Sequence, residues 1–188
     1  MNKMLMAAAA ALVIGGSAFG EMKVGTVDLM LLIRNHSNYE SNKELLSSTD
    51  KDYQKKLDVI KGEGEKLQEE GRKIAEQLQN PMLSQKAKQD VEKQVMDIQK
   101  KLMGIEQRYR SEALRCRQDL QALEARLLKT TTEDLRKRVK AYAEKNGYDF
   151  ILDKSAAPYA KDSYDVTKQV LVSMGVDPKN IKTEDESK

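Results

Sequence analysis

The chain has 188 residues and a formal net charge of +3, a balance too weak to indicate any particular class of partner. Charged residues make up 34% of it, aromatic residues only 5%, and tryptophan is absent. This apolar content is too low for one large compact core, so the composition favours elongated helices. The length fits one domain with an appendage.

Residues 1–20 have the pattern of a cleavable secretory signal peptide. Lys3 precedes an apolar run from Met4 to Ile14, and the small residues Ala18 and Gly20 follow. The run is too short to remain in a bilayer as a spanning helix. The single cysteine, Cys116, lies far from the cleavage site, where a lipid anchor would need one. We therefore expect an exported, soluble protein, whose charge falls from +3 to +2 when Lys3 is removed.

Residues 21–36 are expected to begin a small head. The run KVGTVDL at 23–29 is β-branched and apolar and predicts a strand, and residues 29–33 predict a short helical turn. Capping boxes that start the next helix are spelled by Ser37 with Glu40 or by Ser41 with Glu44.

From Tyr39 onward, apolar residues recur every seven positions. The first row is Tyr39, Leu46, Tyr53, Ile60, Leu67 and Ile74, and the second is Leu57, Gly64, Gly71 and Leu78. The two rows alternate by three and four residues, which predicts the seam of a coiled coil. Asn80 followed by Pro81 ends this helix.

A second helix is expected to return along the first. Ser84 caps it, and Asn146 and Gly147 end it. Its seam is Val91, Val95, Ile98, Leu102, Ile105, Tyr109, Cys116 and Leu123. Because only a short turn separates two matching seams, residues 37–146 should form an antiparallel hairpin arm with its tip at 80–84. The return helix is the longer one, so residues 126–146 should pack on the head.

Residues 147–175 should complete the head. YDFILD at 148–153 predicts a strand, residues 157–160 a third one, and Asp165 caps a closing helix that ends at Gly175. Residues 176–188 are charged and are predicted to be disordered. The fold class is therefore α+β. A head of about 50 residues is too small for a stable core of its own, so we expect oligomerisation.

Open sheet edges of one subunit would be satisfied by strands of another. The residues expected at this contact are Val24, Val27, Phe150, Ile151, Leu152 and Tyr159.

No motif for catalysis, nucleotide binding or metal binding is present. His36 has no cysteine near it, and the GEGEK segment lacks the spacing of a phosphate-binding loop. Cys116 lies on the seam and is interpreted as a small buried residue rather than a reactive thiol. The sequence thus predicts no enzyme, no cofactor and no metal.

Two basic segments suggest anionic partners. The cluster of Arg136, Lys137, Arg138 and Lys140 has acidic neighbours, so a solvated helix face explains it better than binding of nucleic acid or anionic lipid. The second set is Arg108, Arg110, Arg115 and Arg117. For this set, contact with an anionic client or with lipid headgroups stands beside ordinary exposed charge.

At the tip of the arm, Met82 and Leu83 would place apolar side chains in water. They are candidates for contact with an unfolded chain. The alternative is that Leu83 folds back on Leu78 or Val91 to close the seam.

The outgoing helix carries Gly62, Gly64 and Gly71, each of which costs about 1 kcal/mol relative to alanine. Gly64 and Gly71 lie on the seam, where a missing side chain lets two helices approach. Gly62 lies on the outer face, where no partner needs space. We therefore expect these glycines to make the arm compliant.

Three features resemble the Skp/OmpH family of periplasmic chaperones. They are KVGTVDL at 23–29, the charged hairpin, and GYDFILDKSAAPYAKDSYDVTKQVL at 147–171. The last is specific in its order of strand, Asp-Lys, Tyr, Asp-Val-Thr and terminal helix. The resemblance spans the chain after the signal, and over the arms it is one of pattern rather than identity.

This resemblance implies a periplasmic homotrimer in which the heads share a β core. The arms would enclose a cavity that holds unfolded outer-membrane proteins without ATP. Contact with lipopolysaccharide is known in the family, but no residue of this chain is assigned to it. The family's best-known member is markedly basic, whereas this chain is near neutral. We expect an ATP-independent holdase, and the alternative is a structural coiled-coil spacer or adaptor of the cell envelope.

Overall fold

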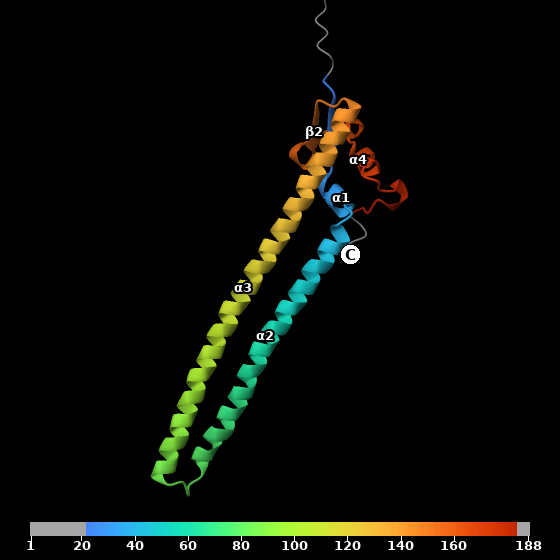
Figure 1. The fold of residues 1–188 in the computed structure, drawn as a ribbon. Coiled ribbons are helices and arrows are strands. Elements are labelled where there is room, and N and C mark those ends of the chain that lie inside the picture. The colour runs from blue at the N-terminus through green and yellow to red at the C-terminus, as the bar shows by residue number, and fades with distance from the viewer. Residues whose placement is uncertain (1–21, 184–188) are drawn as a thin grey trace, which may run out of the picture.

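The computed structural model describes residues 22–183, so the predicted signal peptide lies outside the described residues. It consists of a long arm of two antiparallel helices and a small head that contains a pair of strands (Figure 1). The predicted helical hairpin on a small β-containing head is confirmed. The head differs from the prediction in its number of strands.

The arm consists of helix α2, Tyr39–Glu76, and helix α3, Gln85–Asn146. A 3₁₀ turn, Gln77–Gln79, leads from α2 into the tip. With 38 and 62 residues, the helices extend about 57 Å and about 93 Å. The extra length of α3 runs alongside the head (Figure 1).

The two ends of α3 are capped as the sequence predicts. Ser84 Oγ accepts a hydrogen bond from the Ala87 N–H at 3.3 Å, and Gly147 ends the helix with a φ of 68°. This left-handed conformation favours glycine, because it has no Cβ.

The capping boxes predicted for α2 are wrong. The helix is preceded by Asn38, whose side chain makes no capping hydrogen bond, and Ser37 Oγ contacts Asn38 Oδ1 instead. The His36 carbonyl accepts from the Tyr39 N–H at 2.9 Å. A backbone turn thus takes the place of a side-chain cap.

Both predicted seams face the interior of the hairpin. Every residue of the two α2 rows is buried or half-buried, and in α3 Val91, Ile98 and Cys116 are 5–6% exposed. Tyr109 is the exception on the α3 seam, with 38% of its surface exposed. The seven-residue spacing of apolar residues therefore predicted the pairing of the helices along nearly the whole arm.

The head contains strands β1, Val24–Val27, and β2, Phe150–Asp153, which pair in parallel. In this register Val24 lies opposite Phe150 and Val27 opposite Asp153. Parallel strands need a crossover connection, and here the whole arm is that connection. The arm therefore leaves the head after one strand and re-enters it just before the other.

A third strand at residues 157–160 was predicted, and this is wrong. The segment contains Pro158, which has no N–H to donate to a sheet. The free edge of β1 is instead met by a single bridge from Thr26 to Asp165. Asp165 also accepts a hydrogen bond from the Thr167 N–H at 2.9 Å and so assists the start of helix α4, Thr167–Ser173.

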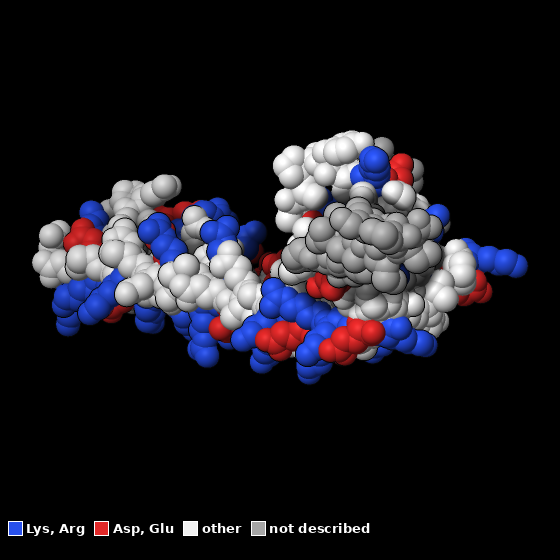
Figure 2. Space-filling model, turned by 90° about the horizontal axis from the view of Figure 1, so that it is seen from above, with Lys and Arg blue, Asp and Glu red and all other residues white. Residues whose placement is uncertain are grey.

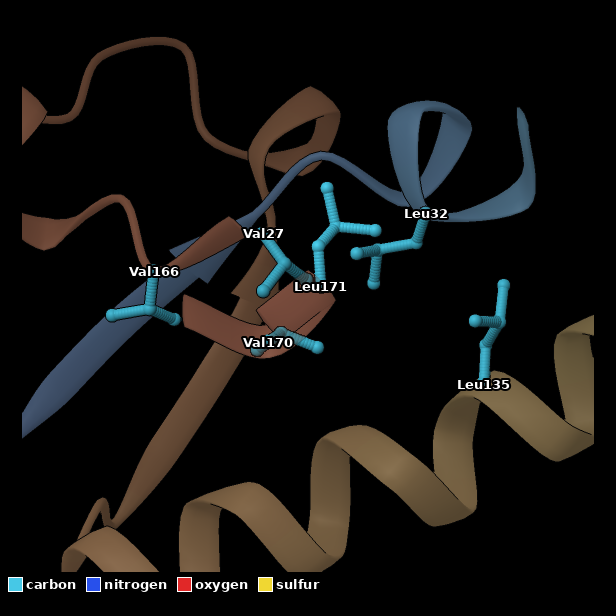
Figure 3. Close-up of a cluster of buried hydrophobic side chains, with 6 residues drawn as sticks. All are labelled: Val27, Leu32, Leu135, Val166, Val170 and Leu171. Atoms are coloured by element: carbon cyan, nitrogen blue, oxygen red, sulfur yellow. The ribbon is translucent and has the colours of Figure 1, made fainter. Parts of the chain in front are cut away.

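The core of the head brings distant segments together. Helix α1, Leu29–Arg34, starts at Asp28, whose carboxylate accepts from the Leu31 N–H at 2.9 Å. In Figure 3, side chains of β1, α1, α3 and α4 converge, and those of Leu32 and Leu171 point toward one another. The cluster is Val27, Leu32, Leu135, Val166, Val170 and Leu171.

The prediction of a disordered tail after residue 175 is wrong for residues 176–183. Val176 and Ile181 pack against the core of the head, and Pro178–Asn180 form a 3₁₀ turn. Two apolar side chains within this charged segment thus contact the core of the head.

Candidate functional site

The arm carries exposed apolar side chains that are scattered rather than joined in one patch. Among the most exposed are Val59, Met96, Met103 and Leu114, with 57–65% of their surfaces exposed. Charged residues separate them along both helices. Such a surface offers many weak apolar contacts to an extended chain and no single deep binding site.

A shallow concavity lies at the middle of the arm. It is an open groove of about 650 Å³ beside Gly64, where the missing side chain uncovers the seam. Its apolar lining consists of Ile60, Leu102, Met103, Ile105 and Tyr109. The groove has the size and chemistry to accept large apolar side chains. Sequence reasoning had identified Gly64 but not the groove, because it depends on which α3 residues lie opposite.

The three glycines of α2, for which the sequence predicted a role in arm flexibility, have different surroundings. A Cβ at Gly62 would meet nothing within 4 Å, and one at Gly64 would lie 3.4 Å from Ile105 Cγ2. At Gly71 it would lie 2.9 Å from Ile98 Cγ2, so only there does close packing require glycine. Gly104, which sequence reasoning missed, also has open space and adjoins the Ile105 that faces Gly64.

Ion pairs join the two helices of the arm. Lys56 pairs with Glu112, and Arg108 pairs with Glu63. The hydrogen bond from Lys56 lowers the pKa of Glu112. These pairs help to fix the register of the two helices.

Most of the candidate arginines are paired within the chain. Besides Arg108, Arg110 pairs with Glu106, and Arg115 Nε lies 3.8 Å from Asp119 Oδ2. Arg117 has no ion pair among residues 22–183. In Figure 2, basic and acidic side chains are interspersed along the lower edge of the molecule. The arm surface is therefore of mixed charge, and a role in client contact stays a prediction for these arginines.

The two candidate residues at the tip differ. Met82 is 88% exposed, and its N–H is held by Asn80 Oδ1 at 3.0 Å, whereas Leu83 is half-buried. Of the two, Met82 alone presents a fully accessible apolar side chain.

The candidate assembly residues fall into two groups. Phe150 and Leu152 point outward from β2 and are 54% and 48% exposed, and Tyr159 is 81% exposed. Val27 is 5% exposed and packs in the chain's own core, so its main role within the chain is to support the sheet. Val24 and Ile151 are half-buried.

One edge of β2 has no strand beside it within residues 22–183. A groove of about 420 Å³ lies next to the sheet, between it and α3. Its apolar lining includes Val27, Leu29, Val139 and Ile151. An open edge with outward apolar side chains and an adjoining groove is a surface suited to assembly.

His36 connects the root of the arm to α3. Its Nδ1 accepts from the Asn38 N–H at 3.2 Å, so Nε2 carries the proton and donates to Asp134 at 3.0 Å. Hydrogen bonds from Arg138 and then from His36 hold the pKa of Asp134 below its ordinary value. The histidine is 7% exposed and has a structural role here, and no group of residues that could hold a metal occurs in the described part of the chain.

The protein is thus elongated, with a helical hairpin on a small strand-containing head and exposed apolar side chains along the hairpin. The family described as "Outer membrane protein (OmpH-like)" matches residues 23–174. The chain belongs to this family, which is one of non-enzymatic periplasmic chaperones for outer-membrane proteins. No curated protein matches the chain.

The family binds unfolded outer-membrane proteins and oligomerises. Within residues 22–183, none of the helices has the length and apolar character needed to cross a membrane.

Proposed function

We propose that this protein is an ATP-independent periplasmic holdase that keeps unfolded outer-membrane proteins soluble between its arms. The observation that carries the proposal is the arm itself, which projects away from the head and has apolar side chains dispersed over both helices. Strands of outer-membrane barrels alternate apolar and polar residues, so the unfolded chains expose many separate apolar side chains. Several weak contacts can retain such a chain and still let it move.

The proposed assembly is a homotrimer formed by the heads. The open edge of β2, with Phe150 and Leu152 exposed beside it, supports an assembly through this strand. The seams of α2 and α3 are used within each hairpin, so the arms have no second apolar seam for one another. Arms that stand apart would leave a space for the client.

The test is the aggregation of a urea-unfolded outer-membrane barrel protein on dilution, followed by light scattering. A holdase suppresses the scattering near one oligomer per client, in the absence of ATP. The control is an equal mass of an unrelated soluble helical protein. If scattering is unchanged at excess protein, the alternative of a structural spacer or adaptor is favoured.

We also propose that the glycines of the middle arm let one cavity admit clients of different sizes. At Gly62 and at Gly104 an added Cβ would meet nothing within 4 Å, yet each glycine weakens its helix. Gly64 lies at the same level and opens the groove. Local bending or fraying of the helices would therefore be easiest at this level.

Replacing Gly62 with alanine strengthens α2 without filling the seam. We expect slower amide exchange over residues 58–68 and weaker capture of a large client than of a small one. The matched control is Gly71→Ala, which adds the same methyl group at a tightly packed level. Slower exchange in Gly62→Ala with unchanged capture of both clients would remove this role.

A further inference from the structure

The residues that follow the family match form a contact with the root of the arm. The match ends at residue 174, whereas the chain continues in defined positions to residue 183. In Figure 1 the ribbon that follows α4 returns toward α1 and the first turn of α2. The returning segment is held by apolar packing, by backbone hydrogen bonds and by an ion pair.

The apolar contacts attach the segment to the head. Val176 and Ile181 are half-buried and pack against the cluster that contains Leu32 and Leu171. The Val176 N–H also donates to the Leu171 carbonyl at 3.1 Å, which continues the end of α4. The segment is thus anchored at both of its ends.

The polar contacts reach the junction between α1 and α2. Asn35 Oδ1 accepts from the Lys182 N–H at 2.8 Å, and Asn35 Nδ2 donates to the Lys182 carbonyl at 3.1 Å. The amide of Asn35 therefore pairs with Lys182 as a neighbouring strand would. The same Nδ2 donates to the Leu31 carbonyl at 2.9 Å, near the end of α1.

The side chain of Lys182 continues onto the arm. Its Nζ donates to Glu40 Oε1 at 2.5 Å and lies 5.9 Å from the centre of the Tyr39 ring. Tyr39 and Glu40 are the first two residues of α2. One residue of the tail thus contacts both the end of α1 and the beginning of α2.

We propose that residues 176–183 are a strap that fixes the root of α2 on the head. Only the turn at 35–38 joins α1 to α2, and a short turn alone leaves freedom for the helix to pivot. On the α3 side the root is held by His36 with Asp134 and by Asn42 with Thr131. The strap holds the side of the root that faces α1. The direction in which α2 leaves the head therefore depends on the strap and on the contacts with α3. The inference goes beyond the proposed function and does not depend on client binding.

The test is amide exchange in the mature protein and in two shortened chains. When the chain ends at residue 175, exchange over residues 36–46 should become about tenfold faster, because the strap and its hydrogen bonds are lost. Exchange over residues 60–75 should not change. The chain that ends at residue 183 is the control and should exchange like the full chain. Unchanged protection at 36–46 in the chain ending at 175 would overturn the proposal.

A charge reversal tests the same contact if the shorter chain fails to fold. Lys182→Glu places a carboxylate against Glu40, and Lys179→Glu makes the same change where the side chain has no ion pair among the described residues. We expect about threefold faster exchange over residues 38–44 in Lys182→Glu alone. Equal protection of this segment in the two variants would contradict the strap.

Discussion

Replacing Gly71 with alanine tests how closely the two helices of the arm pack. Gly62→Ala should raise the free energy of unfolding by about 1 kcal/mol, because alanine favours helix and nothing lies within 4 Å of the new Cβ. Gly71→Ala gains the same propensity, but its Cβ falls 2.9 Å from Ile98 Cγ2. Ile98 is 6% exposed and is stiff at χ1, so it cannot move aside cheaply. Overpacking costs about 1–3 kcal/mol, which leaves Gly71→Ala about 0–2 kcal/mol less stable than the native protein.

Equilibrium unfolding in urea, followed by helical circular dichroism, separates these outcomes. All variants must be compared at one protein concentration, since the stability of an oligomer depends on it. With a slope of about 2 kcal/mol/M, the midpoints of Gly62→Ala and Gly71→Ala should differ by about 0.5–1.5 M. Gly64→Ala, whose Cβ would lie 3.4 Å from Ile105, should resemble Gly62→Ala. If Gly71→Ala stabilises the protein as much as Gly62→Ala does, the close helix contact at Ile98 is refuted.

Three further predictions concern the head and the seam. Phe150→Asp should dissociate the oligomer in sedimentation velocity, whereas Val172→Asp, at a comparably exposed apolar residue of α4, should not. If the oligomer stays intact in both variants, the β2 edge is not the assembly contact. Cys116→Ala should cost about 1 kcal/mol in urea unfolding through lost packing, and reducing agent should have no effect on the native protein, whereas a disulfide-linked species on a non-reducing gel would contradict its burial. Burial raises the pKa of Asp165, but hydrogen bonds from Thr167 and Lys154 outweigh it and leave the pKa below the ordinary 3.8. The stability that Asp165 contributes is thus complete above about pH 4 and is lost as the pH falls further. In urea unfolding at pH 3 and pH 7, Asp165→Asn should reduce the difference in stability between the two pH values. An unchanged difference would show that Asp165 does not cause it.

The arm could be predicted from the sequence because its determinants are local and repeated. The seam residues repeat one spacing along both helices, so a single exposed seam residue such as Tyr109 does not change the predicted pairing of the helices. The ends of α3 were also predictable, since Ser84 and Gly147 act within their own turns. The start of α2 was not, because a backbone turn at His36 takes the place of a side-chain cap, and Glu40 pairs with Lys182 from the other end of the chain.

The head and the candidate site depend on contacts between distant segments. The sequence did not reveal that Asp165 would meet the edge of β1 in place of a third strand, nor that Ile181 would pack on the core. Val27 was expected at a partner's surface because a short apolar strand does not show which of its residues face inward. The groove beside Gly64 required the register of α2 against α3, which is set by packing along the whole arm.

Site-specific photo-crosslinking to an unfolded client tests the central claim most directly. A crosslinker is placed at Met103, beside the groove of the middle arm, at Met82 on the tip, or at Val172 on the head, all of which are exposed. The three proteins are mixed with a urea-diluted outer-membrane barrel protein and irradiated, and the crosslinked client is quantified. If the arms hold the client, the yield is high at Met103 and low at Val172. Crosslinks confined to Met82, or no crosslinks at all with the unfolded client, would contradict a holdase that retains its clients between the arms.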